Sequence, residues 1–73
     1  MYLAVYDISD GKRLKRISAI LQRYGRRVQE SVFECEISGN RYRELCGRLR
    51  KIRKTEDKIY SYYLGPDKKY EEI

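Results

Sequence analysis

The sequence contains no histidine and no tryptophan, and it has only two cysteines and one proline. The absence of histidine removes the commonest general base and the usual partner of a nucleophilic serine or cysteine. Cys35 and Cys46 have no histidine to join them, and their spacing is not that of a zinc ligand set. Any catalysis by this chain must therefore use carboxylates, a bound metal ion, lysine or tyrosine.

A long apolar run is also missing from the sequence. No segment approaches the roughly 20 apolar residues that a transmembrane helix requires, and the first residues lack the pattern of a signal peptide. We therefore expect a cytoplasmic protein with no membrane partner. In that compartment Cys35 and Cys46 would stay reduced, and both are expected to be core residues.

What the sequence does contain is an excess of positive charge. Lysine and arginine number 17 against 11 aspartates and glutamates, which gives a net charge of +6 and a pI near 9.5. The basic residues cluster on particular segments, and such clustering favours a polyanionic partner such as DNA or RNA. The alternative is a basic surface that is merely solvated.

The composition is that of one small folded domain, residues 1–73. Hydrophobic residues make up 41% of the chain and charged residues 38%, which is too apolar for a disordered tail and too charged for a membrane protein. A domain of this size buries only about 60% of the surface that its unfolded chain exposes. We therefore expect a thin core.

Asp7 is the residue that most requires an explanation. It interrupts an apolar and aromatic stretch, residues 2–8, that is typical of a central strand, and a basic helix is predicted directly after it. A carboxylate in such surroundings needs a metal ion, a cation or hydrogen-bond donors. The simplest interpretation is a strand-end carboxylate that accepts hydrogen bonds from the next turn or pairs with a nearby arginine.

Two amphipathic helices are predicted. Ser9 or Asp10 can cap the first, which should run to about Tyr24 before Gly25, and Ser38 can cap the second, which should run to about Lys54. The apolar stripe of the first helix comprises Leu14, Ile17, Ile20, Leu21 and Tyr24. The stripe of the second comprises Tyr42, Leu45, Cys46, Leu49 and Ile52. Asp10 is better explained as a helix cap than as a catalytic group.

The remaining segments predict strands. Residues 26–37 read as extended, but their apolar alternation changes phase midway, so a turn or bulge near residues 30–32 should divide or bend them. Residues 58–64 form the last full strand, and Gly65 and Pro66 mark a turn. The tail after this turn, up to residue 73, should be loose or form a short edge strand.

This order of elements predicts an α+β, ferredoxin-like fold, β-α-β-β-α-β, with both helices on one face of an antiparallel sheet. The strands are apolar or rich in tyrosine in both phases, so the second sheet face also needs cover. A second copy of the chain is the simplest cover. We therefore predict a homodimer packed sheet to sheet.

Two segments resemble a known family, the small CRISPR-associated proteins numbered two, which act with an integrase partner protein in the acquisition of new spacers. The first is residues 5–10, VYDISD, at the end of the first strand. The second is residues 27–34, RVQESVFE, in the middle of the chain. Both match the family's pattern in residue type and spacing, and a basic amphipathic helix joins them.

The resemblance implies a CRISPR adaptation protein that is a ferredoxin-like homodimer, whose first strands bring the two copies of Asp7 together. It also implies a Mg²⁺-dependent endonuclease that acts on single-stranded RNA or double-stranded DNA. By position, Asp7 would be the magnesium ligand, and Tyr6 would support catalysis.

The same resemblance implies nucleic-acid contacts at Arg16, Arg27 and Phe33. One basic position of the family falls on Leu14 here, and its neighbours Arg13 and Lys15 are the candidates to replace it.

Two other functions fit the same residues. A non-catalytic dimeric scaffold that bridges integrase subunits needs only the basic surface, because it would contact phosphates without reading bases or cutting. An RNA-recognition module would stack bases on the tyrosines of the open sheet face. The middle strands lack the aromatic signature of that module, and a dimer would cover the face.

Overall fold

A computed structural model describes all 73 residues, which form two helices and one sheet of five strands. The elements in chain order are β1 (Tyr2–Asp7), α1 (Gly11–Gln22), β2 (Arg26–Gln29), β3 (Val32–Cys35), α2 (Gly39–Ile52), β4 (Lys58–Tyr63) and β5 (Lys69–Glu72). Neither α1 nor α2 has the length and apolar character of a membrane-spanning segment.

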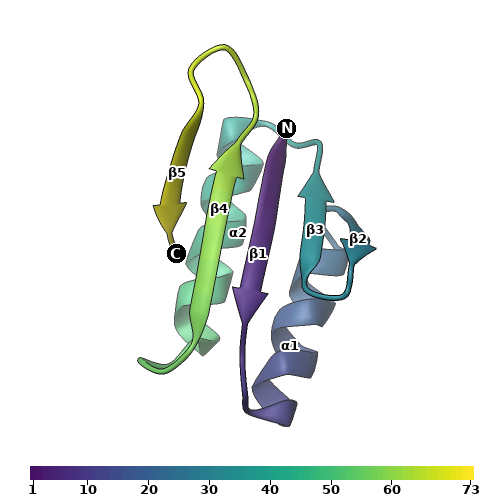
Figure 1. The fold of residues 1–73 in the computed structure, drawn as a ribbon, viewed down its shortest axis with the longest axis vertical. Helices are drawn as coiled ribbons and strands as arrows, with labels where there is room; N and C mark the ends of the chain where they lie inside the picture. The colour runs from purple at the N-terminus through teal and green to yellow at the C-terminus, as the bar shows by residue number, and fades with distance from the viewer.

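The sheet has the strand order β2-β3-β1-β4-β5, and all neighbouring strands are antiparallel (Figure 1). Both helices lie behind the sheet on the same face. The predicted ferredoxin-like fold is confirmed. Residues 69–72 form the edge strand that the sequence left open as an alternative to a loose tail.

The break expected in residues 26–37 is a tight turn with a nearby bulge. Glu30 and Ser31 connect β2 to β3, and the register shifts between Arg27 and Gln29. This geometry lets Phe33 and Cys35 point into the core, while every residue of β2 stays exposed. The change of phase in the apolar alternation of residues 26–37 therefore corresponds to the hairpin of β2 and β3.

Both helix caps occur as predicted. The Asp10 carboxylate accepts a hydrogen bond from the Arg13 backbone at 2.9 Å, and the Ser38 hydroxyl accepts one from the Arg41 backbone at 3.2 Å. Three details differ from the prediction. Helix α1 ends at Gln22 and helix α2 at Ile52, each two residues earlier than predicted. Leu14 is exposed, although the apolar stripe predicted it to be buried, and Ser18 is buried one turn further along α1.

The core lies between the sheet and the helices. It includes both cysteines, which are buried and free, as the sequence predicted. The opposite sheet face, which we call the open face, has no helix over it. By strand register its apolar residues are Leu3, Val5, Val32, Tyr60, Tyr62 and Tyr70. Tyr70 is 69% exposed and stacks on Tyr62 with ring centroids 5.6 Å apart.

Candidate nucleic-acid site

Asp7 is the last residue of β1, and its surroundings come from four elements. The end of β1, the first turn of α1 and the start of β4 lie at the lower end of the molecule in Figure 1. The β2–β3 turn lies beside them, because the Tyr6 amide donates to the Ser31 carbonyl at 3.1 Å. This fold therefore gathers segments that are far apart in sequence around a single carboxylate.

A groove of about 380 Å³ lies next to Asp7. Four of the residues predicted as functional line it, namely Tyr6, Asp7, Lys15 and Arg27. Its other lining residues are Ile8, Leu14, Ser18, Glu30 and Ser31. No sequence pattern singled out Ser18, and Ser31 lies inside the segment 27–34 without having been given a role; both reach the groove because α1 and the β2–β3 turn pack beside the end of β1. We call this hollow the Asp7 groove.

The Asp7 side chain is exposed, and no hydrogen bond or ion pair of the chain engages its carboxylate. The two alternatives that kept it structural, a bond from the next turn and a pair with an arginine, are therefore not realised. The turn after β1 uses Asp10 as its acceptor instead. Asp7 is left free to bind a ligand.

Arg27 is held firmly at the side of the groove. Its guanidinium donates to the Glu30 carbonyl at 2.6 Å and to the Ser18 hydroxyl at 2.5 Å, and it lies 4.9 Å from the Phe33 ring centroid. Because Phe33 is fully buried, it has no surface with which to contact nucleic acid, and that expectation is corrected. Phe33 supports the arginine from below instead.

Tyr6 is buried, and its position limits what it can do. Its ring packs against Phe33 with centroids 6.2 Å apart, and its hydroxyl donates to the Glu30 carbonyl at 3.4 Å. Neighbouring residues of a strand face opposite sides of the sheet, so Tyr6 and Asp7 diverge. Tyr6 lines the groove, and its hydroxyl helps to fix the β2–β3 turn through the bond to Glu30.

Arg13 is committed to other carboxylates. Its guanidinium contacts Asp57 at 2.8 and 3.1 Å and Glu56 at 3.0 Å. The Asp57 side chain is fully buried, and the hydrogen bonds from Arg13 lower its pKa from the ordinary value. Arg13 thus joins the start of α1 to the α2–β4 loop and is a poor candidate for nucleic acid. Lys15 and Arg16 are exposed and form no ion pair.

The chain offers few metal ligands. No group of three or more histidine, cysteine, aspartate or glutamate residues is close enough to hold a metal ion. Among the residues that line the Asp7 groove, Asp7 and Glu30 are the only ones of these four types. A zinc-type cage is therefore absent. Mg²⁺ is less demanding, because it accepts one or two carboxylates and keeps several water ligands. A free, exposed carboxylate such as Asp7 fits that requirement.

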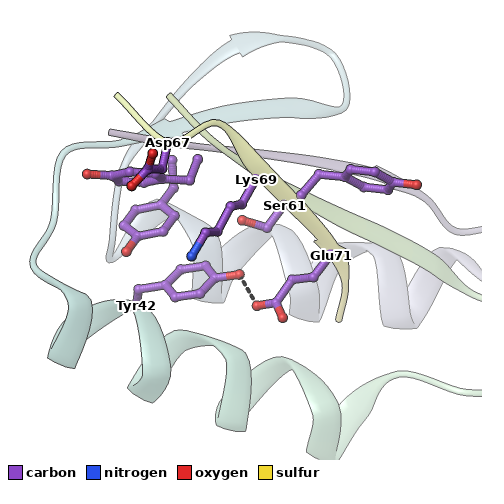
Figure 2. A pocket seen from close by; sticks show the side chains of 8 residues that line it. Tyr42, Ser61, Asp67, Lys69 and Glu71 are labelled. Atoms are coloured by element: carbon purple, nitrogen blue, oxygen red, sulfur yellow. Dashed lines mark hydrogen bonds between the residues drawn. The ribbon is translucent and has the colours of Figure 1, made fainter. Parts of the chain in front are cut away.

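A second and slightly larger groove, of about 420 Å³, lies at the opposite end of the molecule, and Figure 2 shows its side chains from close by. Its aromatic walls are Tyr2, Tyr42, Tyr63 and Tyr70. Lys69 and Glu71 reach from β5 towards α2, and the Tyr42 hydroxyl donates to Glu71 at 2.5 Å. We call it the tyrosine groove. Although it is larger, we place the candidate site at the Asp7 groove, because four of the residues predicted as functional line that groove.

Comparison with known proteins tests the family resemblance that the sequence indicated. The family model for CRISPR associated protein Cas2 matches residues 1–72. A Synechocystis protein named CRISPR-associated endoribonuclease Cas2 3 is 44% identical over 63 residues, which cover 86% of this chain and 68% of that protein. A Thermus thermophilus protein named CRISPR-associated endoribonuclease Cas2 is 35% identical over 69 residues, which cover 92% and 73%.

Solved structures agree with the sequence matches. A Thermus thermophilus protein described as hypothetical superposes with a TM-score of 0.85 at 34% identity, covering 88% of this chain and 79% of that one. Streptococcus pyogenes Cas2 superposes with a TM-score of 0.80 at 34% identity, covering 88% and 84%. The chain belongs to the CRISPR associated protein Cas2 family.

Proposed function

We propose that this chain is a Mg²⁺-dependent endonuclease of CRISPR adaptation, with Asp7 as the metal ligand and RNA as the first substrate to test. The observation that carries the proposal is the free carboxylate of Asp7 at a groove edged by cations. The names of the similar proteins, CRISPR-associated endoribonucleases, favour RNA over duplex DNA.

Residues around Asp7 supply what phosphodiester binding requires. Lys15 lines the groove and is free to contact a phosphate oxygen. Arg27 is fixed by Ser18 and the Glu30 carbonyl, and its remaining N–H groups stay available on an exposed side chain. The two cations would therefore hold a phosphate group beside Asp7.

The chemistry that the chain lacks would come from the metal. Mg²⁺ bound at a carboxylate lowers the pKa of a water ligand and offsets charge on the scissile phosphate. This role suits a chain without histidine, because the commonest general base is absent and the groove residues can position a phosphate.

The proposal includes a homodimer formed through the open face. Leu3, Val5 and Tyr60 are only partly buried there, and Tyr62 and Tyr70 are exposed. A second copy packed sheet to sheet would bury these side chains, and it would bring another Asp7 towards the first because both lie at the end of β1. Two carboxylates remain within the number that Mg²⁺ accepts.

A scaffold without cutting activity is the second candidate. It is favoured by the small number of metal ligands in one chain and by the net charge of +6. In this function, the dimer would hold nucleic acid through its phosphates while it bridges two integrase subunits. Its binding would weaken steeply with salt and would survive the loss of Asp7.

The test uses the purified protein with labelled single-stranded RNA and duplex DNA, with Mg²⁺ or with EDTA. The Asp7→Asn variant keeps the shape of the side chain and removes its charge. We expect it to lower the cleavage rate by at least about 100-fold, the scale seen when a group that stabilises transition-state charge is removed. EDTA should abolish cleavage by the unaltered protein.

The matched control is Asp67→Asn, which makes the same change at an exposed residue of the opposite end. It should cut at the unaltered rate. Light scattering and thermal melting of each variant separate a lost site from a lost dimer or fold. If the unaltered protein binds both polymers without cutting either, the nuclease proposal is rejected in favour of the scaffold.

A further inference from the structure

Lys58 stands directly beside Asp7, although the sequence separates the two residues widely. It is the first residue of β4, and its Cα pairs with that of Asp7 in the antiparallel β1–β4 ladder. Opposite residues of such a ladder project from the same face of the sheet. Because Lys58 is exposed and belongs to the last residue pair of the ladder, it lies at the end of the open face and not in its apolar centre.

The backbone at Lys58 is held by the residue before it. Asp57 is fully buried, accepts two hydrogen bonds from Arg13, and accepts a third from the Lys54 backbone at 2.9 Å. The Arg53 guanidinium donates to the Asp57 carbonyl. A network of this kind fixes the point at which β4 begins, so the base of the Lys58 side chain has a defined position next to Asp7.

The other cations near Asp7 differ in how free they are. Arg13 is bound to three carboxylates, and Arg27 is bound to Ser18 and to the Glu30 carbonyl. Lys15 and Lys58 form no ion pair within 4.0 Å. They belong to different elements: Lys15, which lines the Asp7 groove, lies on α1, and Lys58, the cross-strand neighbour of Asp7, lies on β4.

We propose that Lys58 is a further substrate-contacting residue, which binds a phosphate group of the nucleic acid at the Asp7 site. The inference rests on the proposed function in so far as nucleic acid occupies the Asp7 groove. A phosphate brought towards Asp7 meets a carboxylate of its own sign, and a free lysine in the neighbouring strand offsets that repulsion. Lysine suits this task because its ammonium is a compact charge on a flexible stem.

The experiment measures binding in EDTA, so that it does not depend on cleavage. A short fluorescein-labelled single-stranded RNA is titrated with unaltered protein, Lys58→Gln and Lys58→Arg at several salt concentrations. We expect Lys58→Gln to weaken binding roughly five- to tenfold at low salt and to reduce the slope of log K against log salt by about 0.7, the value for one contact to a single strand. Lys58→Arg should restore most of the affinity.

The matched control is Lys68→Gln, which removes the same charge from an exposed residue in the loop before β5. It should change the affinity by less than half as much. If Lys58→Gln binds RNA as Lys68→Gln does, the proposal is overturned. The same holds if Lys58→Gln lowers only the melting temperature, because Lys58 would then be a cross-strand partner of Asp7 that stabilises the sheet.

The two proposals fail in different ways. An unaltered protein that binds RNA in EDTA and never cuts it with Mg²⁺ would reject the nuclease, and the binding of Lys58→Gln would still decide the role of Lys58. Where cleavage does occur, Lys58→Gln should raise KM, because the loss of a phosphate contact weakens substrate binding in the ground state and in the transition state alike.

Discussion

The two grooves of this protein have similar volumes, about 380 and 420 Å³, and opposite character. In the tyrosine groove, the Tyr2 and Tyr42 rings stack with centroids 4.0 Å apart, and Tyr42 binds Glu71. In the Asp7 groove, hydrogen bonds fix the Arg27 guanidinium against Ser18 and the β2–β3 turn, and the Asp7 carboxylate has no partner within the chain. The difference indicates that volume is a poor guide to a site in so small a domain.

A second contrast concerns how each end is held together. The tyrosine end relies on aromatic packing and on a hydrogen bond at the surface. The Asp7 end relies on a buried charge, Asp57, whose partner Arg13 comes from a distant part of the sequence. Buried charges are costly to leave unpaired, whereas exposed hydrogen bonds contribute little. The two ends should therefore respond very differently to substitution.

The largest effect should follow from the loss of Asp57. The Asp57→Ala variant leaves Arg13 without its bidentate partner and removes the acceptor of the Lys54 amide. We expect the melting temperature to fall by more than about 10 °C, because breaking a buried ion pair is strongly destabilising in a small domain. At the other end, Glu71→Ala should lower it by less than about 5 °C. Equal losses would remove the contrast between the ends.

Acid should act on the same buried pair. Arg13 lowers the pKa of Asp57 in the folded state, so the stability from this carboxylate is complete above its ordinary pKa and is lost as pH falls through the lower folded value. The free energy of unfolding, from urea titrations, should therefore decline as the pH falls below the ordinary pKa of an aspartate. The decline should be shallower in Asp57→Asn.

Glu44 provides the control for that measurement. The Tyr24 hydroxyl donates to it at 2.6 Å and lowers its pKa, so Glu44 contributes acid sensitivity of the same sign. If the decline is unchanged in Asp57→Asn and is abolished in Glu44→Gln, the acid sensitivity belongs to the helix surface and not to the Asp7 end.

The smallest effect should come from Tyr42. Burial, with the hydrogen bond to Glu71, raises the pKa of Tyr42, so its hydroxyl remains a donor at neutral pH. Tyr42→Phe removes that bond while it keeps the ring stacked on Tyr2. We expect a loss of about 1 kcal/mol or less in the free energy of unfolding. Hydrogen exchange should become faster in β5 and stay unchanged in β1.

The control for Tyr42→Phe is Tyr70→Phe, because the Tyr70 hydroxyl forms no hydrogen bond within the chain. It should leave exchange in β5 unaltered. Faster exchange in both variants would mean that the edge strand depends on ring packing and not on the bond between Tyr42 and Glu71.

The sequence alone was enough to predict the helix starts, the break in residues 26–37 and the family. Asp10 and Ser38 cap their helices because each offers a short side-chain acceptor just before an amphipathic segment. The change of phase in residues 26–37 required a break or bend, because a single straight strand could not bury both apolar sets on one face. The structure shows that the break is a hairpin. The motif around Asp7 pointed to the family that the comparisons show.

Only the tertiary structure decided which charges are free. The sequence offered Arg13 as a nucleic-acid contact and did not reveal that Asp57 would capture it, because their pairing depends on how α1 and the α2–β4 loop pack. Phe33 was predicted to contact nucleic acid, but the β2–β3 hairpin places its side chain in the core. Lys58 became the neighbour of Asp7 through strand register. Pairing between distant residues follows from packing, which local patterns do not encode.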